Sequence, residues 1–313
     1  MKRRITLPLG IDVGASRIRI AHAEVDDAGR PSLVAVAVRD AGGDLGPTIA
    51  SAVAELGTRE RRCVFGISEP DAILRLATLP KMTRGERERA ARFEASRFVD
   101  YPITQAIVRI APINATTGEC VIGATRKSVI ANITSAAKRA GLRLIGVDNA
   151  GFALRRAFPQ SDAILDVGYD ASVLHLFGRE LPIAQYYSTG GRTFTGAVAE
   201  SLGIDHDAAE RRKVTHGLSG AGEYVRDALV ENIASALIDF RSNGSTDIGS
   251  IALVGNGARL SSLPDAIERA TAIPTHLASF APDVSHTLPP DVLRAAAADW
   301  GTAYGLTLWD LAA

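Results

Sequence analysis

The chain has 313 residues, and its 35 Lys and Arg residues equal its 35 Asp and Glu residues in number. This length exceeds that of the usual single hydrophobic core and predicts two domains or lobes. The balanced charge gives no electrostatic support for nucleic-acid binding, and two distant cysteines, Cys63 and Cys120, fit neither a disulfide framework nor a zinc site. No stretch approaches the ~20 apolar residues of a membrane span, so we expect a cytoplasmic protein.

Three predicted strands open the first half. Residues 9–16 read Leu-Gly-Ile-Asp-Val-Gly-Ala-Ser, an apolar strand that ends in a tight turn with a hydroxyl, and two further apolar runs follow up to Val38. Short alternating runs between turn residues indicate antiparallel hairpins, so we expect a three-strand meander. A helix with Ile49 and Val53 on one face comes next, and Gly57 is placed to end it.

Residues 71–143 form a predicted α+β module inserted into the first half. A strand begins at Ile73, and a capping box of Thr83 and Glu86 opens a helix rich in Arg and Glu. Two more strands follow, and then a helix of apolar spacing that ends at Gly141.

The second half repeats the opening pattern. Residues 163–172 again place Asp-Val-Gly at the end of an apolar strand, and two more apolar runs reach Tyr187. A later helical stripe consists of Leu229, Ile233, Leu237 and Phe240. The chain is therefore predicted to contain two related halves.

The two Asp-Val-Gly turns are candidates for a shared phosphate–metal site. Glycine lets the backbone approach phosphate oxygens, and an Asp can act on phosphate through Mg²⁺ or its waters. A single Asp-x-Gly turn usually has only a structural role. Asp12 and Asp166, however, occupy equivalent places of a repeat, which favours a role in binding. The two turns could close on one polyphosphate from opposite sides.

Further segments agree with nucleotide binding. Residues 188–195 and 254–260 are glycine turns before helical stretches, where anions are favoured, although each alone would be read as a plain connection. Glu210 and Lys213 lie one helical turn apart and could grip a ribose or an adenine edge. The six scattered histidines predict no zinc site, and neither a P-loop nor a nucleophile elbow occurs.

Several of these segments resemble the motifs of the actin-like ATPases. Residues 10–21 and 164–172 resemble the two phosphate motifs, and residues 254–260 resemble the adenosine motif. Within that superfamily the chain is similar to the PilM family of type IV pilus assembly proteins. The segments that show this likeness are Leu79–Met82, Glu94–Pro102, Ala140–Leu142, Val147–Asp148, Ala153–Arg156, Ala209–Lys213 and Tyr304–Leu306.

The resemblance implies an α/β, actin-like two-lobed fold with a duplicated ribonuclease-H-like core and an inserted α+β subdomain, IC. The implied division is lobe I at 1–158, with its IA core at 1–70 and 144–158 and IC at 71–143, and lobe II at 159–313, with its IIA core at 159–198 and 246–299, IIB at 199–245 and a C-terminal helix at 300–313 that returns to lobe I.

The resemblance also implies ATP and Mg²⁺ in the cleft between the lobes. Asp12 and Asp166 would hold Mg²⁺ through water. The residues expected to contact the nucleotide are Asp12, Gly14, Ala15, Ser16, Arg19, Asp166, Gly168, Ser172, Gly190, Gly191, Glu210, Lys213, Gly255, Asn256 and Gly257. Catalysis needs a residue that positions water, and Asp148 and Asn149, near the crossing between the lobes, are the candidates. At most slow hydrolysis is expected.

Three positions depart from the family pattern. The family usually has Lys where Arg19 stands, Gly at Asn256 and Thr at Ser172. An arginine keeps the positive charge of the lysine, but its guanidinium is bulkier and forked.

The implied partner is a membrane protein. PilM-like proteins are scaffolds that bind the N-terminal tail of PilN in a groove of lobe I near IC, which would tie this chain to the inner membrane. Self-association and the machine that the protein serves stay open. Three alternatives stay open. A sugar-kinase-like phosphotransferase is disfavoured by the small insertion, and an FtsA-like cell-division filament protein is disfavoured because no amphipathic membrane helix follows the last core helix. A secretion-system domain that has kept the fold and lost ATP is disfavoured because Asp12 and Asp166 are both intact.

Overall fold

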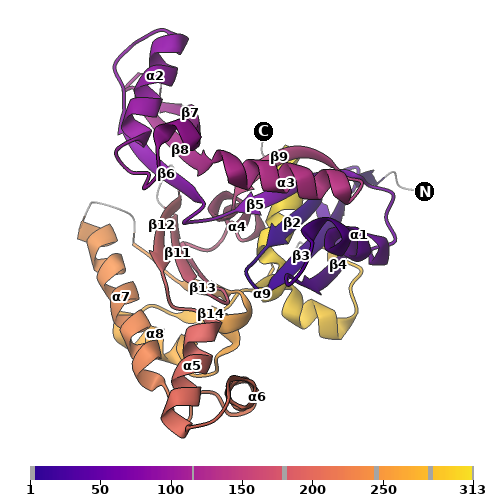
Figure 1. Ribbon diagram of the computed structural model, residues 1–313, viewed down its shortest axis with the longest axis vertical. Helices are drawn as coiled ribbons and strands as arrows, with labels where there is room; N and C mark the ends of the chain where they lie inside the picture. Colours follow the sequence, from indigo (N-terminus) through magenta and orange to yellow (C-terminus); the bar gives the residue numbers. More distant parts are fainter. Residues whose placement is uncertain (1–3, 115, 178–181, 243–246, 281–284, 312–313) are drawn as a thin grey trace.

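The computed structural model describes residues 4–114, 116–177, 182–242, 247–280 and 285–311, over which the chain forms two large sheets and a small one (Figure 1). The first large sheet has the order β15-β4-β3-β2-β5-β9, with β1 paired to β3. Its strands are β1 (Ile5–Thr6), β2 (Leu9–Val13), β3 (Arg17–Val25), β4 (Pro31–Asp40), β5 (Arg62–Ile67), β9 (Arg143–Asn149) and β15 (Ser285–His286). The predicted meander of β2, β3 and β4 is confirmed, and β5 and β9 continue the sheet in parallel.

The second large sheet repeats the plan of the first. Its strands are β10 (Ala163–Val167), β11 (Ser172–Phe177), β12 (Pro182–Tyr187), β13 (Ile251–Val254) and β14 (Thr275–Leu277). Their order, β12-β11-β10-β13-β14, corresponds strand for strand to β4-β3-β2-β5-β9, with the same parallel and antiparallel pairings. The internal repeat is therefore confirmed, and Asp12 and Asp166 are each the fourth residue of the equivalent strands β2 and β10.

Two helices cover one face of the first sheet. The predicted apolar helix is α1 (Leu45–Glu55), and Gly57 follows it with a φ of 64°. Helix α3 (Lys127–Arg139) lies beside α1, where Ala136 and Ala137 join the same hydrophobic core. The sequence analysis counted α3 in the inserted module, whereas the structure packs it against α1 and β9.

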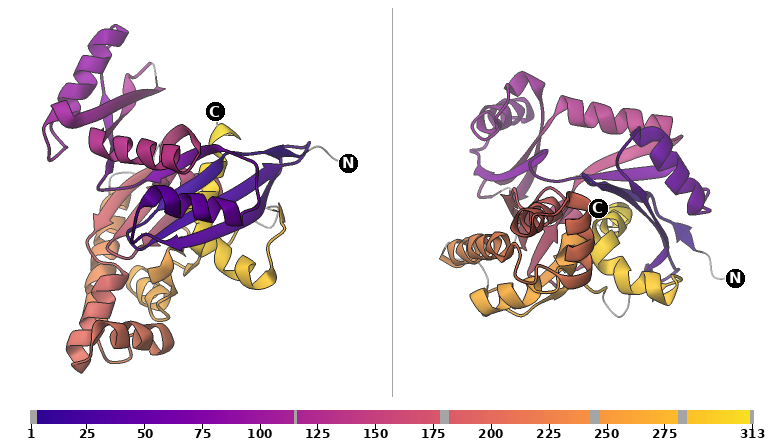
Figure 2. Two further views of the ribbon diagram at one scale, coloured as in Figure 1. Left: turned by 45° about the vertical axis from the view of Figure 1, so that its right-hand side comes forward. Right: turned by 60° about the horizontal axis from the view of Figure 1, so that its bottom comes forward.

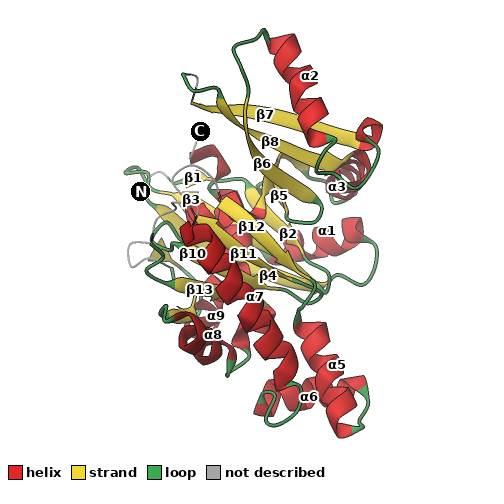
Figure 3. Ribbon diagram, turned by 90° about the vertical axis from the view of Figure 1, so that its left-hand side faces the viewer, coloured by secondary structure: helices red, strands yellow, loops and turns green. Residues whose placement is uncertain are grey.

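The rest of that module is a small separate layer at one end of the molecule (Figure 3). Strands β6 (Ala72–Thr78), β8 (Glu119–Arg126) and β7 (Ala106–Asn114) form an antiparallel sheet in that order, accompanied by α2 (Arg84–Ala95) and the short helix η1 (Ile103–Gln105). Thr83 and Glu86 make the predicted capping box of α2. Ala91, Ala95 and Ile122 are buried in a core of this layer's own.

The opposite end of the molecule is helical (Figure 3). It contains α5 (Gly191–Leu202), α6 (His206–His216) and α7 (Glu223–Ser242), and η2 (Asn256–Arg259) and α8 (Leu263–Thr271) follow after β13. The predicted stripe of α7 is confirmed, because Leu229, Ile233, Leu237 and Phe240 are all buried. They share one core with the inner faces of β10, β11 and β13.

Two helices join the large sheets. Helices α4 (Ala150–Ala157) and α9 (Pro290–Thr307), the latter followed by η3 (Trp309–Leu311), pack on each other, and their core includes residues of both sheets. Figure 2 shows α9, in yellow, beside the indigo strands of the first sheet. The approach of α9 to β2 is so close that a Cβ on Gly10 would lie 1.8 Å from the carbonyl oxygen of Ala303. The chain returns to the first sheet at β15, which pairs with β4. The sequence predicts this return only from residue 300. None of the helices in the described ranges is long and apolar enough to cross a membrane.

Candidate functional site

A row of three cavities runs between the two large sheets. Their volumes are about 580, 460 and 250 Å³. The first and second share the lining residues Ser16, Gly168, Tyr169, Asn256 and Asp299. The second and third share Asp12, Val13, Ser68, Asp71 and Asp166. The cavities therefore adjoin end to end, and the two strand-end carboxyl groups stand at the junction of the second and third.

Asp12 and Asp166 influence each other across this junction. Burial raises the pKa of Asp12, and the charge of Arg19 opposes that shift. Burial, and then the like charge of Asp12, raise the pKa of Asp166 to about 6, again against Arg19. A cation between these carboxyl groups would favour their ionised forms.

The donor chemistry of this pair fits Mg²⁺. The ion binds carboxylate oxygen, commonly takes only one or two carboxylates, and completes its shell with water and substrate phosphates. In the part of the chain that the structure describes, no three His, Cys, Asp or Glu side chains gather around one point suited to a metal.

The two repeat turns have the same local structure. The amide of Gly14 donates to the carbonyl oxygen of Arg17, and the amide of Gly168 donates to that of Ala171, both over 2.9 Å. Of the residues predicted here, Gly14, Ala15, Ser16 and Gly168 line the cavities. Both turns thus present backbone to the same space, as expected for two related phosphate-facing loops.

Ser172 and Gly190 have a different place from the one expected. Ser172 is fully buried, and its hydroxyl donates to the carbonyl oxygen of Thr189 over 2.6 Å. A Cβ on Gly190 would lie 2.6 Å from the amide nitrogen of Ala171. Neither residue lines the three cavities, whereas Gly191, the first residue of α5, lines the largest. Ser172 and Gly190 therefore support the second turn from the side that faces away from the cavities.

Glu210 and Lys213 pair with each other and line the largest of the three cavities. The Lys213 ammonium donates to the Glu210 carboxylate and to the Thr195 hydroxyl, each over 2.7 Å, and to the carbonyl oxygen of Gly191 over 3.1 Å. The Thr195 hydroxyl also bonds with Glu210. Burial opposes ionisation of Glu210, but these hydrogen bonds outweigh it and lower its pKa. The cluster fixes a charged carboxylate and an ammonium at this end of the cleft.

The glycines of the 254–260 segment allow a close backbone approach. A Cβ on Gly255 would lie 2.5 Å from the carbonyl oxygen of Val167, and one on Gly257 would lie 2.4 Å from a methyl carbon of the same residue. Asn256, between them, accepts a 2.8 Å hydrogen bond from Arg19. All three residues line the cavities, and so does Arg19.

The two weak catalytic candidates lie outside the cavities. Asp148 forms an ion pair with Arg156, and the Asn149 side chain accepts from the amide of Gly151 as the N-cap of α4. Only their neighbour Ala150 lines the third cavity. The polar groups of both side chains are thus engaged in local structure.

Other residues of the cavities were not among the predicted site residues. Arg259 of η2 and Asp299 of α9 form an ion pair over 3.0 Å beside the largest cavity. Tyr169 and Asp71 also line the cleft. The Asp299 contact depends on the packing of α9 between the lobes, which a local motif does not reveal.

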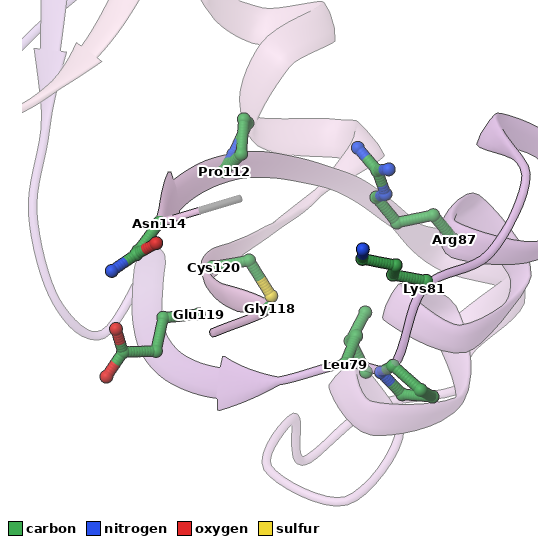
Figure 4. Close-up of a pocket in the computed structure, with 9 residues that line it drawn as sticks. Leu79, Lys81, Arg87, Pro112, Asn114, Gly118, Glu119 and Cys120 are labelled. Carbon is green, nitrogen blue, oxygen red and sulfur yellow. The ribbon is translucent and has the colours of Figure 1, made fainter. Parts of the chain in front are cut away.

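A fourth cavity of about 90 Å³ lies apart from the cleft, in the small layer (Figure 4). The Cys120 sulfur points into it, and Lys81 and Arg87 stand on one side. It contains none of the predicted site residues.

Comparison with solved structures identifies the fold. A structure described as a PilM-PilN type IV pilus biogenesis complex matches with a TM-score of 0.84 and 26% identity, over 96% of this chain and 97% of that one. The ethanolamine utilization protein EutJ from Carboxydothermus hydrogenoformans matches with a TM-score of 0.55 and 16% identity over 96% of this chain and 89% of that one. A diol dehydratase-reactivating factor matches with a TM-score of 0.56 and 11% identity over 98% and 99%. The last two likenesses concern the fold alone.

These matches agree with the predicted architecture, an actin-like two-lobed α/β fold with a duplicated core and a small inserted α+β layer. No curated protein matches the chain in sequence. The family described as type IV pilus assembly protein PilM matches residues 38–310. The chain belongs to that family.

Proposed function

We propose that this protein is an ATP-binding scaffold of a type IV pilus or related secretion machine, and that it binds the N-terminal tail of a PilN-like inner-membrane protein. The observation that supports this most directly is the family match over residues 38–310, together with the likeness to the PilM-PilN complex over 96% of the chain. Membership of this family favours a scaffold over the kinase and filament-protein alternatives. The protein would lie on the cytoplasmic side of the inner membrane through its partner.

The proposed nucleotide is ATP with Mg²⁺ in the two larger cavities of the row, of about 580 and 460 Å³. Asp12 and Asp166 would hold the ion, which would supply positive charge beside the phosphates. The Gly14 and Gly168 turns would face the phosphate oxygens, and Glu210 with Lys213 would face the nucleoside at the far end of the largest cavity. The supporting observation is the pair of carboxyl groups whose pKa values are raised where an added cation would relieve them.

We further propose that ATP is held rather than turned over quickly. Rapid hydrolysis needs a side chain that positions water against the terminal phosphate. Asp148 is paired with Arg156, and Asn149 caps a helix, so neither is free to do this without losing those contacts.

We retain the division into IA, IC, IIA and IIB as a proposal, but we group α3 with IA and begin the return to lobe I at β15, because α3 packs on α1 and β15 pairs with β4. The proposed peptide groove lies on lobe I beside the connection from β5 to β6. The 250 Å³ cavity there is lined by Leu45 of α1, Val129 and Ile133 of α3, and Ser68 and Asp71 of the connection. Apolar walls with a charged rim suit a short peptide with apolar anchors.

The experiment is a titration of the cytoplasmic tail peptide of the PilN-like protein from the same genome. Asn132 is exposed on α3 and lines the groove, so Asn132→Arg should weaken peptide binding at least about tenfold, which corresponds to about 1.4 kcal/mol. Ser135→Arg, on the same helix and outside the lining, is the matched control. Equal peptide affinities for the wild type and both variants would place the peptide elsewhere, and no binding of the peptide to the wild type would refute the scaffold proposal.

A further inference from the structure

A side-chain hydrogen bond joins the two repeats across the cleft. The guanidinium Nη2 of Arg19 donates to the side-chain oxygen of Asn256 over 2.8 Å, and the bond is partly buried. Arg19 is on β3 of the first sheet, and Asn256 begins η2 after the second sheet, 237 residues later. We call this contact the Arg19–Asn256 bridge. It needs no atom from a ligand.

The Asn256 end of the bridge is held rigidly. Gly255 has a φ of 85°, its amide donates to the carbonyl oxygen of Ala298 over 2.8 Å, and a Cβ there would lie 2.6 Å from the Asp166 carboxylate. Gly257 packs equally closely on Val167. The backbone on both sides of Asn256 is therefore fixed to β10 and α9. The position of Asn256 is therefore set by its contacts with β10 and α9.

The Arg19 end lies where phosphates are proposed to bind. Arg19 stands directly opposite Asp12 in the β2–β3 pairing, and a Cβ on Gly14 would lie 3.8 Å from its Nη1. A guanidinium has five N–H donors in a fixed fork. One of them serves Asn256, and the others can bind phosphate oxygens without breaking the bridge.

We propose that Asn256 is a positioning residue, and that the Arg19–Asn256 bridge holds the lobes together before nucleotide binds. This rests on the proposed nucleotide site. The guanidinium is then already oriented when the phosphates bind. Nucleotide leaves slowly, because the cleft opens only when the bridge breaks. A Lys at position 19 would be a single point charge and could not serve the asparagine and the phosphates with one planar fork.

The test is a double-mutant cycle with Asn256→Ala, Arg19→Lys and both together. The readouts are the release rate of a fluorescent ATP analogue and the interlobe distance without nucleotide. The distance is measured by electron–electron resonance between spin labels at Ala54→Cys on α1 and Ile238→Cys on α7, both exposed positions. Asn232→Ala, an exposed asparagine of α7, is the matched control.

We expect Asn256→Ala to speed release about tenfold or more, the scale of one charged hydrogen bond, and to broaden the interlobe distance distribution of the ligand-free protein. In the Arg19→Lys background it should have no further effect on either readout. Additive effects, or an unchanged distance distribution in Asn256→Ala, would overturn the proposal. If the wild type binds no nucleotide, the proposed nucleotide function fails, and the distance measurement still decides on the bridge.

Discussion

Arg19 and Asn256 contact each other across the cleft, and they stand at two positions where the resemblance predicts Lys and Gly. Taken separately along the sequence, the two departures look like independent weakenings of a nucleotide site. In the structure they are donor and acceptor of one hydrogen bond. Each residue is the hydrogen-bond partner of the other, so a change of either one alone would remove the partner that the other has here.

Asp166→Asn should stabilise the ligand-free protein while removing Mg²⁺-dependent ATP binding. The pKa of Asp166 is about 6 in the folded protein, above its ordinary value of 3.8, so ionisation is disfavoured in the fold. Wild-type stability should accordingly fall as pH rises from about 4 through about 6, by at most about 3 kcal/mol. Urea unfolding across this range should show that slope in the wild type and a flatter curve in the variant. Equal slopes would contradict the account of this carboxyl group.

His175 should make the protein sensitive to acid. Both of its ring nitrogens are buried without a hydrogen-bond partner among the described residues, and burial lowers its pKa from 6.5 to about 4. The unfolded chain therefore binds a proton first, and stability should fall by up to about 3 kcal/mol as pH drops from about 6.5 to about 4. His175→Leu should flatten this part of the pH profile in thermal unfolding. His276→Gln, at an exposed position of β14, is the control.

Two glycines in helices should respond oppositely to alanine. A Cβ on Gly305 of α9 would lie 1.9 Å from the backbone oxygen of Ala153 in α4, so Gly305→Ala should cost about 3 kcal/mol by separating the two helices between the lobes. A Cβ on Gly196 of α5 would meet nothing within 4 Å, so Gly196→Ala should stabilise by up to about 1 kcal/mol. Urea unfolding of both variants tests this, and a tolerated Gly305→Ala would mean that α4 and α9 are not packed this closely.

The repeat and the turns were predictable from the sequence, and the contacts between lobes were not. Asp12 and Asp166 could be matched because each is the fourth residue of the first strand of an equivalent meander, and local pattern determines such elements. The Arg259–Asp299 ion pair depends on where α9 packs, and the Arg19–Asn256 bridge on how two separate sheets approach each other. Ser172 was expected to face phosphate because of its place in a motif, but its hydroxyl is bonded behind the turn to Thr189. Side-chain direction at a turn depends on neighbours that a motif does not contain.

The two cysteines should react with thiol reagents at different rates. Cys63 is fully buried in the core of the first sheet, and burial raises its pKa to about 12. The Cys120 thiol is also buried and its pKa is raised, but it borders the 90 Å³ cavity beside Arg87, whose charge favours the thiolate (Figure 4). In the native protein both thiols should react slowly, and Cys120 should react before Cys63. In denaturant both thiols should react rapidly. Cys63→Ala and Cys120→Ala identify each signal, and faster native labelling of Cys63 would contradict the packing of that sheet.

The most direct test of the central claim is isothermal titration of the protein with ATP in the presence of Mg²⁺, run beside the Asp12→Ala variant. We expect saturable binding to the wild type, strong weakening in the variant, and native far-ultraviolet circular dichroism in both, because Asp12 lines the cleft and packs in none of the hydrophobic cores. Failure of the wild type to bind, or equal affinity in a folded variant, would contradict the proposed nucleotide cleft.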